Sequence, residues 1–218
     1  MEEKVEKLFL ANSEINSIYN KSNLESKIEN CEFDKKEKYK YVDITIFPKS
    51  INTLISFAED EEITEAPATR VYHENKTLIE NSSIQDRIVE HFNFQLKGNY
   101  RNEGLAKTIH KNELIIYKAN DIKEIHLTSA SDGVLVWLFL GYIFINEEEK
   151  LDFIEKINMG IRAYFREILK IKKNIPKISN LEDIKSIKHK LCPKNKMWFT
   201  QWFQKNMVET FQMYKKVI

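Results

Sequence analysis

The first 36 residues carry apolar side chains at mostly helical spacing, with a polar interruption at residues 20–23. Spacing of this kind is typical of amphipathic helices. The pattern predicts two short helices that together form an N-terminal helical extension over residues 1–36. The apolar positions are Val5, Leu8, Phe9, Ile15, Ile18 and Tyr19.

Residues that favour strands recur between residues 39 and 96, where a short helix that Ser50 could cap and a polar loop over 59–65 separate two predicted strand regions. Residues 39–47 form the first predicted strand, and Pro48 ends it. Residues 69–96 are predicted to form two or three antiparallel strands, with turns at 74–76 and 81–83. The clearest of these strands places Ile88, Phe92, Phe94 and Leu96 on its apolar face, and His91, Asn93 and Gln95 on the other.

Helices and strands alternate in the rest of the chain. The elements expected from periodicity and from capping residues are a helix over 105–119, a strand over 122–128, a short apolar helix over 134–140 and a strand over 142–145. A long amphipathic helix follows over residues 147–173, and no strand is indicated beyond it. Aromatic residues in the tail, 197–218, recur at helical spacing and predict contact with the body of the protein or with a second subunit.

These elements predict an α/β (α+β) fold with a mixed, mostly antiparallel central sheet that is flanked by helices, and with extra helices at both ends. The 218 residues are enough for one ample core, because domains usually contain roughly 100–200 residues. We expect the core domain over residues 37–146, after the extension of residues 1–36. A C-terminal helical segment, 147–218, is expected to pack on the core or on a partner.

Charge and cysteine content exclude several kinds of partner and site. The formal net charge is +1, so no overall field attracts nucleic acid or an anionic membrane. The two cysteines, Cys31 and Cys192, lack the spacing of metal ligands and are expected to be free thiols. We therefore expect no metal, no nucleic-acid partner and no membrane partner.

Two groups of lysines leave nucleic-acid contact open as an alternative, although such groups usually form solvated faces. The N-terminal region opens with charged residues and lacks the apolar run of a secretion signal. The longest apolar run, residues 134–145, is shorter than a membrane span of about 20 residues. A cytoplasmic location is the resulting expectation. The lysines are Lys170, Lys172 and Lys173 in the first group, and Lys185, Lys188 and Lys190 in the second.

A turn between the predicted strand that ends at Leu96 and the predicted helix that begins at Leu105 carries the candidate chemistry. Amide groups at a helix start lack partners within the helix and lie at the positive end of its dipole, so they can bind a pyrophosphate. Gly104 and Ala106 are small enough for phosphates to approach these amides. Arg101 can add a charge-assisted hydrogen bond. We therefore expect residues 101–106 to hold phosphate groups.

This turn resembles the phosphate loop of the GNAT-type, acyl-CoA-dependent N-acetyltransferases. Arg101, Gly104 and Ala106 match its pattern of Arg or Gln, two residues, Gly, one residue, then Gly or Ala. The later order of strand, polar turn, apolar helix and Gly-aromatic pair is also similar, so the resemblance covers residues 89–145. It implies a GNAT-like fold with acetyl-CoA as co-substrate. The cofactor-binding residues that it implies are Phe94, Gln95, Leu96, Arg101, Asn102, Glu103, Gly104, Leu105, Ala106 and Ser131.

The resemblance also implies direct acyl transfer, in which a base removes a proton from the amine and an acid protonates the leaving thiolate. Glu90 and His91 are candidates for the base, because a family base often lies on this strand; a surface residue is the alternative for each. Where many members have a tyrosine acid, this sequence has Trp137, whose indole N–H is not a useful acid. Tyr142 is the candidate acid, with a core aromatic as the alternative.

The expected function is transfer of an acetyl group from acetyl-CoA to an amine of a small molecule or a protein. The alternative is a catalytically inactive GNAT-like interaction module that binds acyl-CoA or a protein partner. Trp137 and the missing strand after the long helix are the two departures from the family pattern, so enzymatic activity stays open at this point. A homodimer through the terminal helices is open as well.

Overall fold

The computed structural model divides the chain into two compact units. The first unit contains Met1–Leu127 and Lys215–Ile218, and the second contains Thr128–Tyr214. The predicted domain segments 1–36, 37–146 and 147–218 have other limits and stay a prediction. The residues that the structure describes are 9–20, 24–34, 39–48, 68–78, 84–96, 104–130, 133–184, 196–207 and 209–218.

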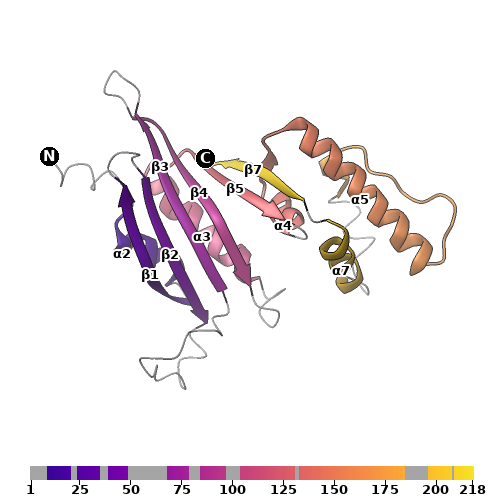
Figure 1. Ribbon diagram of the computed structural model, residues 1–218, viewed down its shortest axis with the longest axis horizontal. Helices are drawn as coiled ribbons and strands as arrows, with labels where there is room; N and C mark the ends of the chain where they lie inside the picture. The colour runs from indigo at the N-terminus through magenta and orange to yellow at the C-terminus, as the bar shows by residue number, and fades with distance from the viewer. Residues whose placement is uncertain are drawn as a thin grey trace. The chain divides into compact units, whose positions relative to one another are not determined.

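The first unit is a mixed sheet with two helices, α2 and α3, on one face (Figure 1). Strands β1 to β4 are antiparallel neighbours in sequence order, and β5 pairs with β4 in parallel. The amide of Val217 donates to the carbonyl of Lys123 at 2.8 Å, which places the end of the chain beside the start of β5. Its elements are α2 (Asn12–Tyr19), β1 (Leu24–Asp34), β2 (Tyr39–Pro48), β3 (Ala68–Leu78), β4 (Ile84–Leu96), α3 (Leu105–Ala119) and β5 (Glu124–Ala130), of which the last three residues belong to the second unit.

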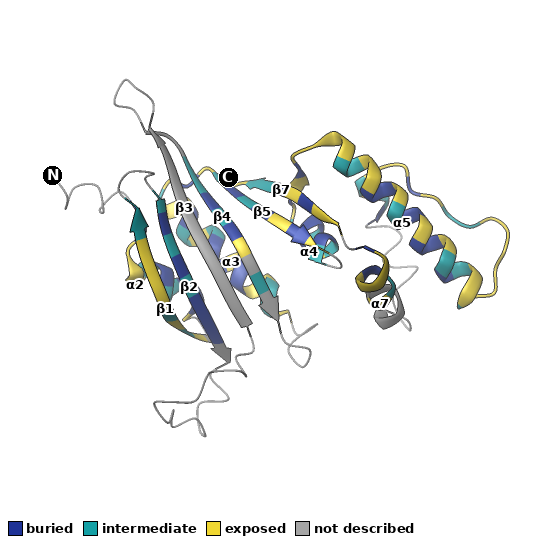
Figure 2. Cartoon of the chain, in the orientation of Figure 1, coloured by how far each residue is buried: buried dark blue, intermediate teal, exposed yellow. Residues whose placement is uncertain are grey.

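Strand β2 shows how the sheet buries one face. Val42, Ile44 and Ile46 are at most 2% exposed, whereas Tyr41 and Asp43 are half-buried (Figure 2). The buried face is the one toward α2, because Lys40 on the same face donates to Asn12 Oδ1 in the first turn of α2 at 2.6 Å. The strand predicted over residues 39–47 is thus confirmed, and its buried face lies toward the helices.

A β-bulge interrupts the alternation predicted for β4. Tyr72 of β3 is paired with His91 and Val71 with Asn93, so Phe92 is an extra residue on β4. Up to this bulge the alternation is regular, but its buried face carries Val89 and His91, which are 0% and 2% exposed, whereas Phe92 is 53% exposed. The prediction that Phe92 faces the core and His91 faces away from it is therefore wrong.

Two further predictions for the first unit are wrong. Residues 24–34 form strand β1, which pairs with β2 from Leu24↔Pro48 to Asp34↔Tyr39, and not a second helix. The expected turn at 74–76 lies inside β3. The turn at 81–83 lies outside the described residues. Pairing to a neighbouring strand decides such segments, since strand preference depends strongly on tertiary context.

The second unit contains an aromatic core between helices and a short antiparallel ladder. Strand β6 pairs with β7 at Ile143↔Tyr214 and Phe144↔Met213. Asn146 caps α5, because its side chain accepts a hydrogen bond from the amide of Glu148 at 2.8 Å. The elements are α4 (Gly133–Phe139), β6 (Ile143–Phe144), α5 (Glu147–Glu167), α7 (Lys196–Asn206) and β7 (Thr210–Lys216), of which the last two residues belong to the first unit.

Strand β7 contradicts the expectation that no strand follows the long helix. The tail forms helix α7 over Lys196–Asn206 and then β7 over Thr210–Lys216, where Phe211 and Met213 are buried. Helix α5 ends at Glu167, earlier than predicted. The predicted fold class is confirmed, because the chain is mixed α/β and most of its strand pairs are antiparallel. No described helix is both long and apolar enough to cross a membrane.

Candidate functional site

The start of α3 has the backbone geometry that the sequence predicts for a phosphate site. Gly104 precedes the helix with φ 79° and ψ 7°, a left-handed conformation that strongly favours glycine. The first bond of the helix runs from the amide of Thr108 to the carbonyl of Gly104, at 3.0 Å. The amides of Leu105, Ala106 and Lys107 precede that bond and find no acceptor among the described residues. They can therefore donate hydrogen bonds to an anion that lies at the positive end of the helix dipole.

The space around this corner is open. A Cβ atom on Gly104 would meet no heavy atom within 4 Å, so the backbone conformation and not a clash restricts the position to glycine. Gly104 is exposed, and Leu105 and Ala106 are half-buried. The other predicted phosphate-loop residues, Arg101, Asn102 and Glu103, lie outside the described residues, as does Ser131.

The end of β4 leads toward this corner along the chain. The parallel ladder with β5 runs from Ile88↔Glu124 to His91↔Leu127, although β4 continues to Leu96. The predicted cofactor contacts Phe94, Gln95 and Leu96 therefore lie past the last pair of that ladder. The side chain of Phe94 is half-buried.

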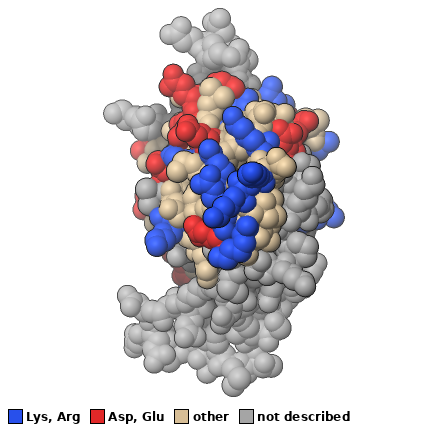
Figure 3. Space-filling view, turned by 90° about the vertical axis from the view of Figure 1, so that its right-hand side faces the viewer, with Lys and Arg blue, Asp and Glu red and all other residues tan. Residues whose placement is uncertain are grey.

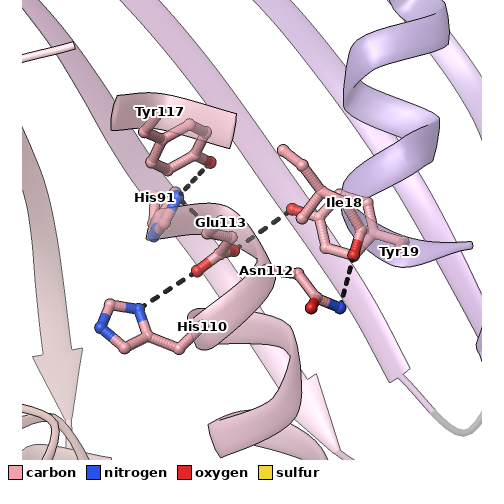
Figure 4. A network of polar contacts seen from close by, with 7 residues as sticks. All are labelled: Ile18, Tyr19, His91, His110, Asn112, Glu113 and Tyr117. Atoms are coloured by element: carbon pink, nitrogen blue, oxygen red, sulfur yellow. Dashed lines mark hydrogen bonds and ion pairs between the residues drawn. The ribbon is translucent and has the colours of Figure 1, made fainter. Parts of the chain in front are cut away.

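A buried polar network lies between α3, β4 and α2 (Figure 4). Its centre is the carboxyl group of Glu113, which is 0% exposed. The hydroxyl of Tyr19 donates to Glu113 Oε1 at 3.3 Å, His91 Nε2 lies 3.7 Å from the same oxygen, and His110 Nδ1 lies 3.4 Å from Oε2. The side-chain amide of Asn112 donates to the carbonyl of Ile18 at 2.9 Å, which adds a second contact between α3 and α2.

The network shows where the candidate base His91 lies. Its Nε2 is 3.0 Å from the hydroxyl of Tyr117, and its ring packs 6.0 Å from that of Tyr117. Since His91 is 2% exposed, the alternative of a surface residue is wrong for it. Glu90, the other candidate, is half-buried on β4. The described residues, these included, contain no group of His, Cys, Asp or Glu placed to hold a metal ion.

The aromatic pair at α4 and β6 lies in the second unit. Trp137 is 7% exposed and meets the ring of Tyr142 edge to face at 5.2 Å. Gly141, with φ 89°, ends α4 and lets the amide of Tyr142 bond to the carbonyl of Trp137 at 3.0 Å. Tyr142 is 1% exposed, as expected of the core aromatic that was the alternative to an acid.

The predictions brought together Gly104, Leu105 and Ala106 but missed the network behind them. Glu113 follows Ile109 and precedes Tyr117 by four residues, so it lies on the buried stripe of α3. A carboxylate in the middle of an apolar stripe was the signal that the sequence offered. His110 and Asn112 gave no such signal, because they flank the stripe.

Comparisons with known proteins give likeness at the level of structure only. No protein-family model matches the chain, and no curated protein matches it in sequence. The chain is similar to NAA60 of Arabidopsis thaliana in complex with acetyl-CoA, with 8% identity, TM-score 0.36, and coverage of 49% of this chain and 64% of that one. It is also similar to the GNAT domain of PAT from S. lividans, with 12% identity, TM-score 0.30, and coverage of 49% of this chain and 53% of that one.

A third similar structure is the AtaT toxin bound to the C-terminus of the antitoxin AtaR and acetyl-CoA, with 8% identity, TM-score 0.36, and coverage of 57% of this chain and 88% of that one. The chain spans less than two thirds of the length of the NAA60 and PAT structures. One of these similar structures is a GNAT domain, the family whose phosphate loop the residues 101–106 resemble. At these TM-scores the likeness assigns no activity and no residue role to this chain.

Proposed function

We propose that the chain binds acyl-CoA at the start of α3 and transfers the acyl group to an amine of a small molecule or a protein. The observation that carries the proposal is the corner at Gly104. Three successive amides, those of Leu105, Ala106 and Lys107, have no acceptor among the described residues, and the left-handed glycine before them turns the chain into the helix. Such a corner suits a diphosphate because it combines donors, dipole and small side chains.

The remaining site residues are proposals on the same basis. The pantetheine arm would run along the end of β4, where Phe94, Gln95 and Leu96 lie past the ladder with β5. Arg101 would contact a phosphate, with Asn102, Glu103 and Ser131 nearby. Glu90 is the better placed candidate base, since it is half-buried and His91 is committed to the buried network. A cytoplasmic location and a homodimer stay predictions.

The same helix offers a matched test of binding. Ala106→Asp places a negative charge beside the proposed phosphates, whereas Ala119→Asp places the same side chain at the other end of α3. An acid in the first helical turn favours the helix, so Ala106→Asp should fold at least as well as wild type. We expect calorimetric titration with acetyl-CoA to show about a 100-fold weaker affinity for Ala106→Asp and nearly wild-type affinity for Ala119→Asp. Equal affinities in the two variants would rule the corner out.

A second function has one observation in its favour. Trp137 and Tyr142 pack against each other and are at most 7% exposed, so neither is presented as a proton donor. Acyl-CoA binding without turnover would therefore indicate an interaction module. A thiol-release assay over a panel of amines separates the two functions, because only the enzyme releases free CoA.

A further inference from the structure

The end of α5 and the segment after it form a strongly basic surface in the second unit. Residues 162–177 contain six basic side chains and one acidic side chain, Glu167, which gives a local net charge of +5 in a protein whose total is +1. All six basic side chains are exposed, and Figure 3 shows Lys and Arg gathered on the face that it presents. They are Arg162, Arg166, Lys170, Lys172, Lys173 and Lys177, which we call the basic segment.

The charges of the basic segment are not neutralised within the described part of the chain. The lysines nearer the start of α5 have acidic partners: Lys150 lies 2.7 Å from Glu147, and Lys156 lies 2.7 Å from Asp152. None of the six basic residues makes an ion pair with a described residue. The first part of the helix, residues 147–156, has five acidic and two basic side chains, whereas its end and the segment after it carry net positive charge.

Two exposed aliphatic residues alternate with these lysines. Leu169 is 41% exposed and Ile171 is 43% exposed. The turn that carries them is held by hydrogen bonds, from the amide of Leu169 to the carbonyl of Tyr164 at 3.3 Å and from the amide of Ile171 to the carbonyl of Phe165 at 2.9 Å. Lys170 between them has φ 58°, in the left-handed region. The turn thus presents apolar and basic side chains together from a fixed backbone.

We propose that the basic segment, with Leu169 and Ile171, binds the surface of an anionic lipid bilayer. Lysines attract acidic headgroups, and exposed aliphatic side chains gain free energy by entering the boundary between headgroups and acyl chains. Nucleic acid fits less well, because single-stranded sites pair basic residues with exposed aromatics for stacking. In this segment Tyr164 is buried and Phe165 half-buried. The expectation of no membrane partner rested on the total charge, which conceals this local excess.

The test measures by co-sedimentation how the full chain binds to vesicles of phosphatidylcholine, with and without phosphatidylserine. We expect binding only to the vesicles that contain phosphatidylserine. Replacing Lys170, Lys172 and Lys173 together by Gln should weaken binding by about 100-fold. The control replaces Lys111, Lys118 and Lys205, which are equally exposed, and should bind like wild type. Lys172→Gln alone should weaken binding by about 5-fold.

A second pair of variants tests the aliphatic contribution. Leu169→Ser combined with Ile171→Ser should weaken vesicle binding by roughly 10-fold or more, whereas Leu151→Ser combined with Ile115→Ser, at sites that are 58% and 51% exposed, should not. Equal binding to both kinds of vesicle, or equal loss in lysine variant and control, would overturn the proposal. The proposal would also be overturned if the chain bound a labelled oligonucleotide more tightly than the vesicles and the Leu169 and Ile171 changes left that binding unaltered. That result would identify nucleic acid as the partner.

Discussion

The interior of the first unit contains a buried carboxyl group, whereas the interior of the second contains a cluster of phenylalanine rings. Glu113 is 0% exposed and contacts side chains from α2, α3 and β4. In the second unit Phe153 packs 5.2 Å from Phe144, 6.4 Å from Phe203 and 5.5 Å from Phe211. The contacts of Glu113 are directional, whereas those of Phe153 depend on apolar area.

The difference predicts two kinds of response to mutation. Apolar burial is non-directional, so its loss depends mainly on the volume removed. A buried polar network is stable only when its members are satisfied, so a change of a few atoms can destabilise it strongly or hardly at all. The network also fixes where α2 lies on α3, because Tyr19 and the carbonyl of Ile18 can bond to Glu113 and Asn112 in only one arrangement.

The largest effect is expected in the aromatic core. Phe153→Ala removes a fully buried ring and should lower the free energy of unfolding by about 4 kcal/mol. All three tryptophans, Trp137, Trp198 and Trp202, belong to the second unit, so their fluorescence during urea unfolding measures this change. Leu151→Ala on the same helix is the control, because Leu151 is 58% exposed; its effect should stay below about 0.5 kcal/mol. Similar losses at the two positions would contradict the core position of Phe153.

In the polar core the size of the effect should depend on chemistry more than on volume. Glu113→Ala leaves Tyr19 and the two histidines without the carboxyl group and should cost about 3 kcal/mol. Glu113→Gln retains the shape and one acceptor oxygen and should cost only about 1 kcal/mol. Hydrogen exchange of the α3 amides measures both. If Gln were as destabilising as Ala, the hydrogen bonds would not be the source of the stability.

A double-mutant cycle isolates the contact to α2. Tyr19→Phe should cost about 1 kcal/mol in the wild-type protein and almost nothing together with Glu113→Ala, because the acceptor of its hydrogen bond is then already lost. Additive costs would show that Tyr19 and Glu113 contribute independently, contrary to the 3.3 Å contact between them.

The sequence predicts elements best where many consecutive residues follow one pattern. Strands β2 and β4, with 10 and 13 residues, and the bounds of α3 were found in this way. Strand β7 has only 7 residues, of which Phe211 and Met213 are buried, and it follows an aromatic-rich helix. Its pairing with β6 involves residues far apart in the chain, and helical spacing over the tail cannot report such pairing.

The part of the candidate site that depends on backbone conformation was predictable from the sequence. A glycine before a helix start indicates the corner at Gly104, and the structure has a left-handed residue there. The orientation of His91 was not predictable in the same way, because apolar residues stand on both faces of β4: Val89 is buried on the same face as His91, while Phe92 is 53% exposed on the other. Which face of a strand packs against the helices depends on tertiary context, and the period alone does not decide it.

The smallest effect concerns a charge at the edge of the aromatic core. The ammonium group of Lys156 lies 2.7 Å from Asp152 and 2.8 Å from Glu209, and 5.7 Å above the ring of Phe211. Burial alone would lower the pKa of Lys156, but the hydrogen bonds to both carboxylates outweigh it and raise the pKa above its ordinary value of 10.5. Lys156→Met should therefore cost roughly 0.5 kcal/mol near neutral pH.

The raised pKa also fixes how this cost depends on pH. Because the folded state binds the proton more tightly, the stabilisation is complete below pH 10.5 and is lost as the pH rises through the folded-state pKa. The stability difference between wild type and Lys156→Met should therefore shrink in strongly alkaline solution. Lys150→Met is the matched control, because among the described residues Lys150 pairs with Glu147 of its own helix turn and with no other acid. A difference that stays the same at every pH would show that Lys156 contributes through its aliphatic stem and not through its charge.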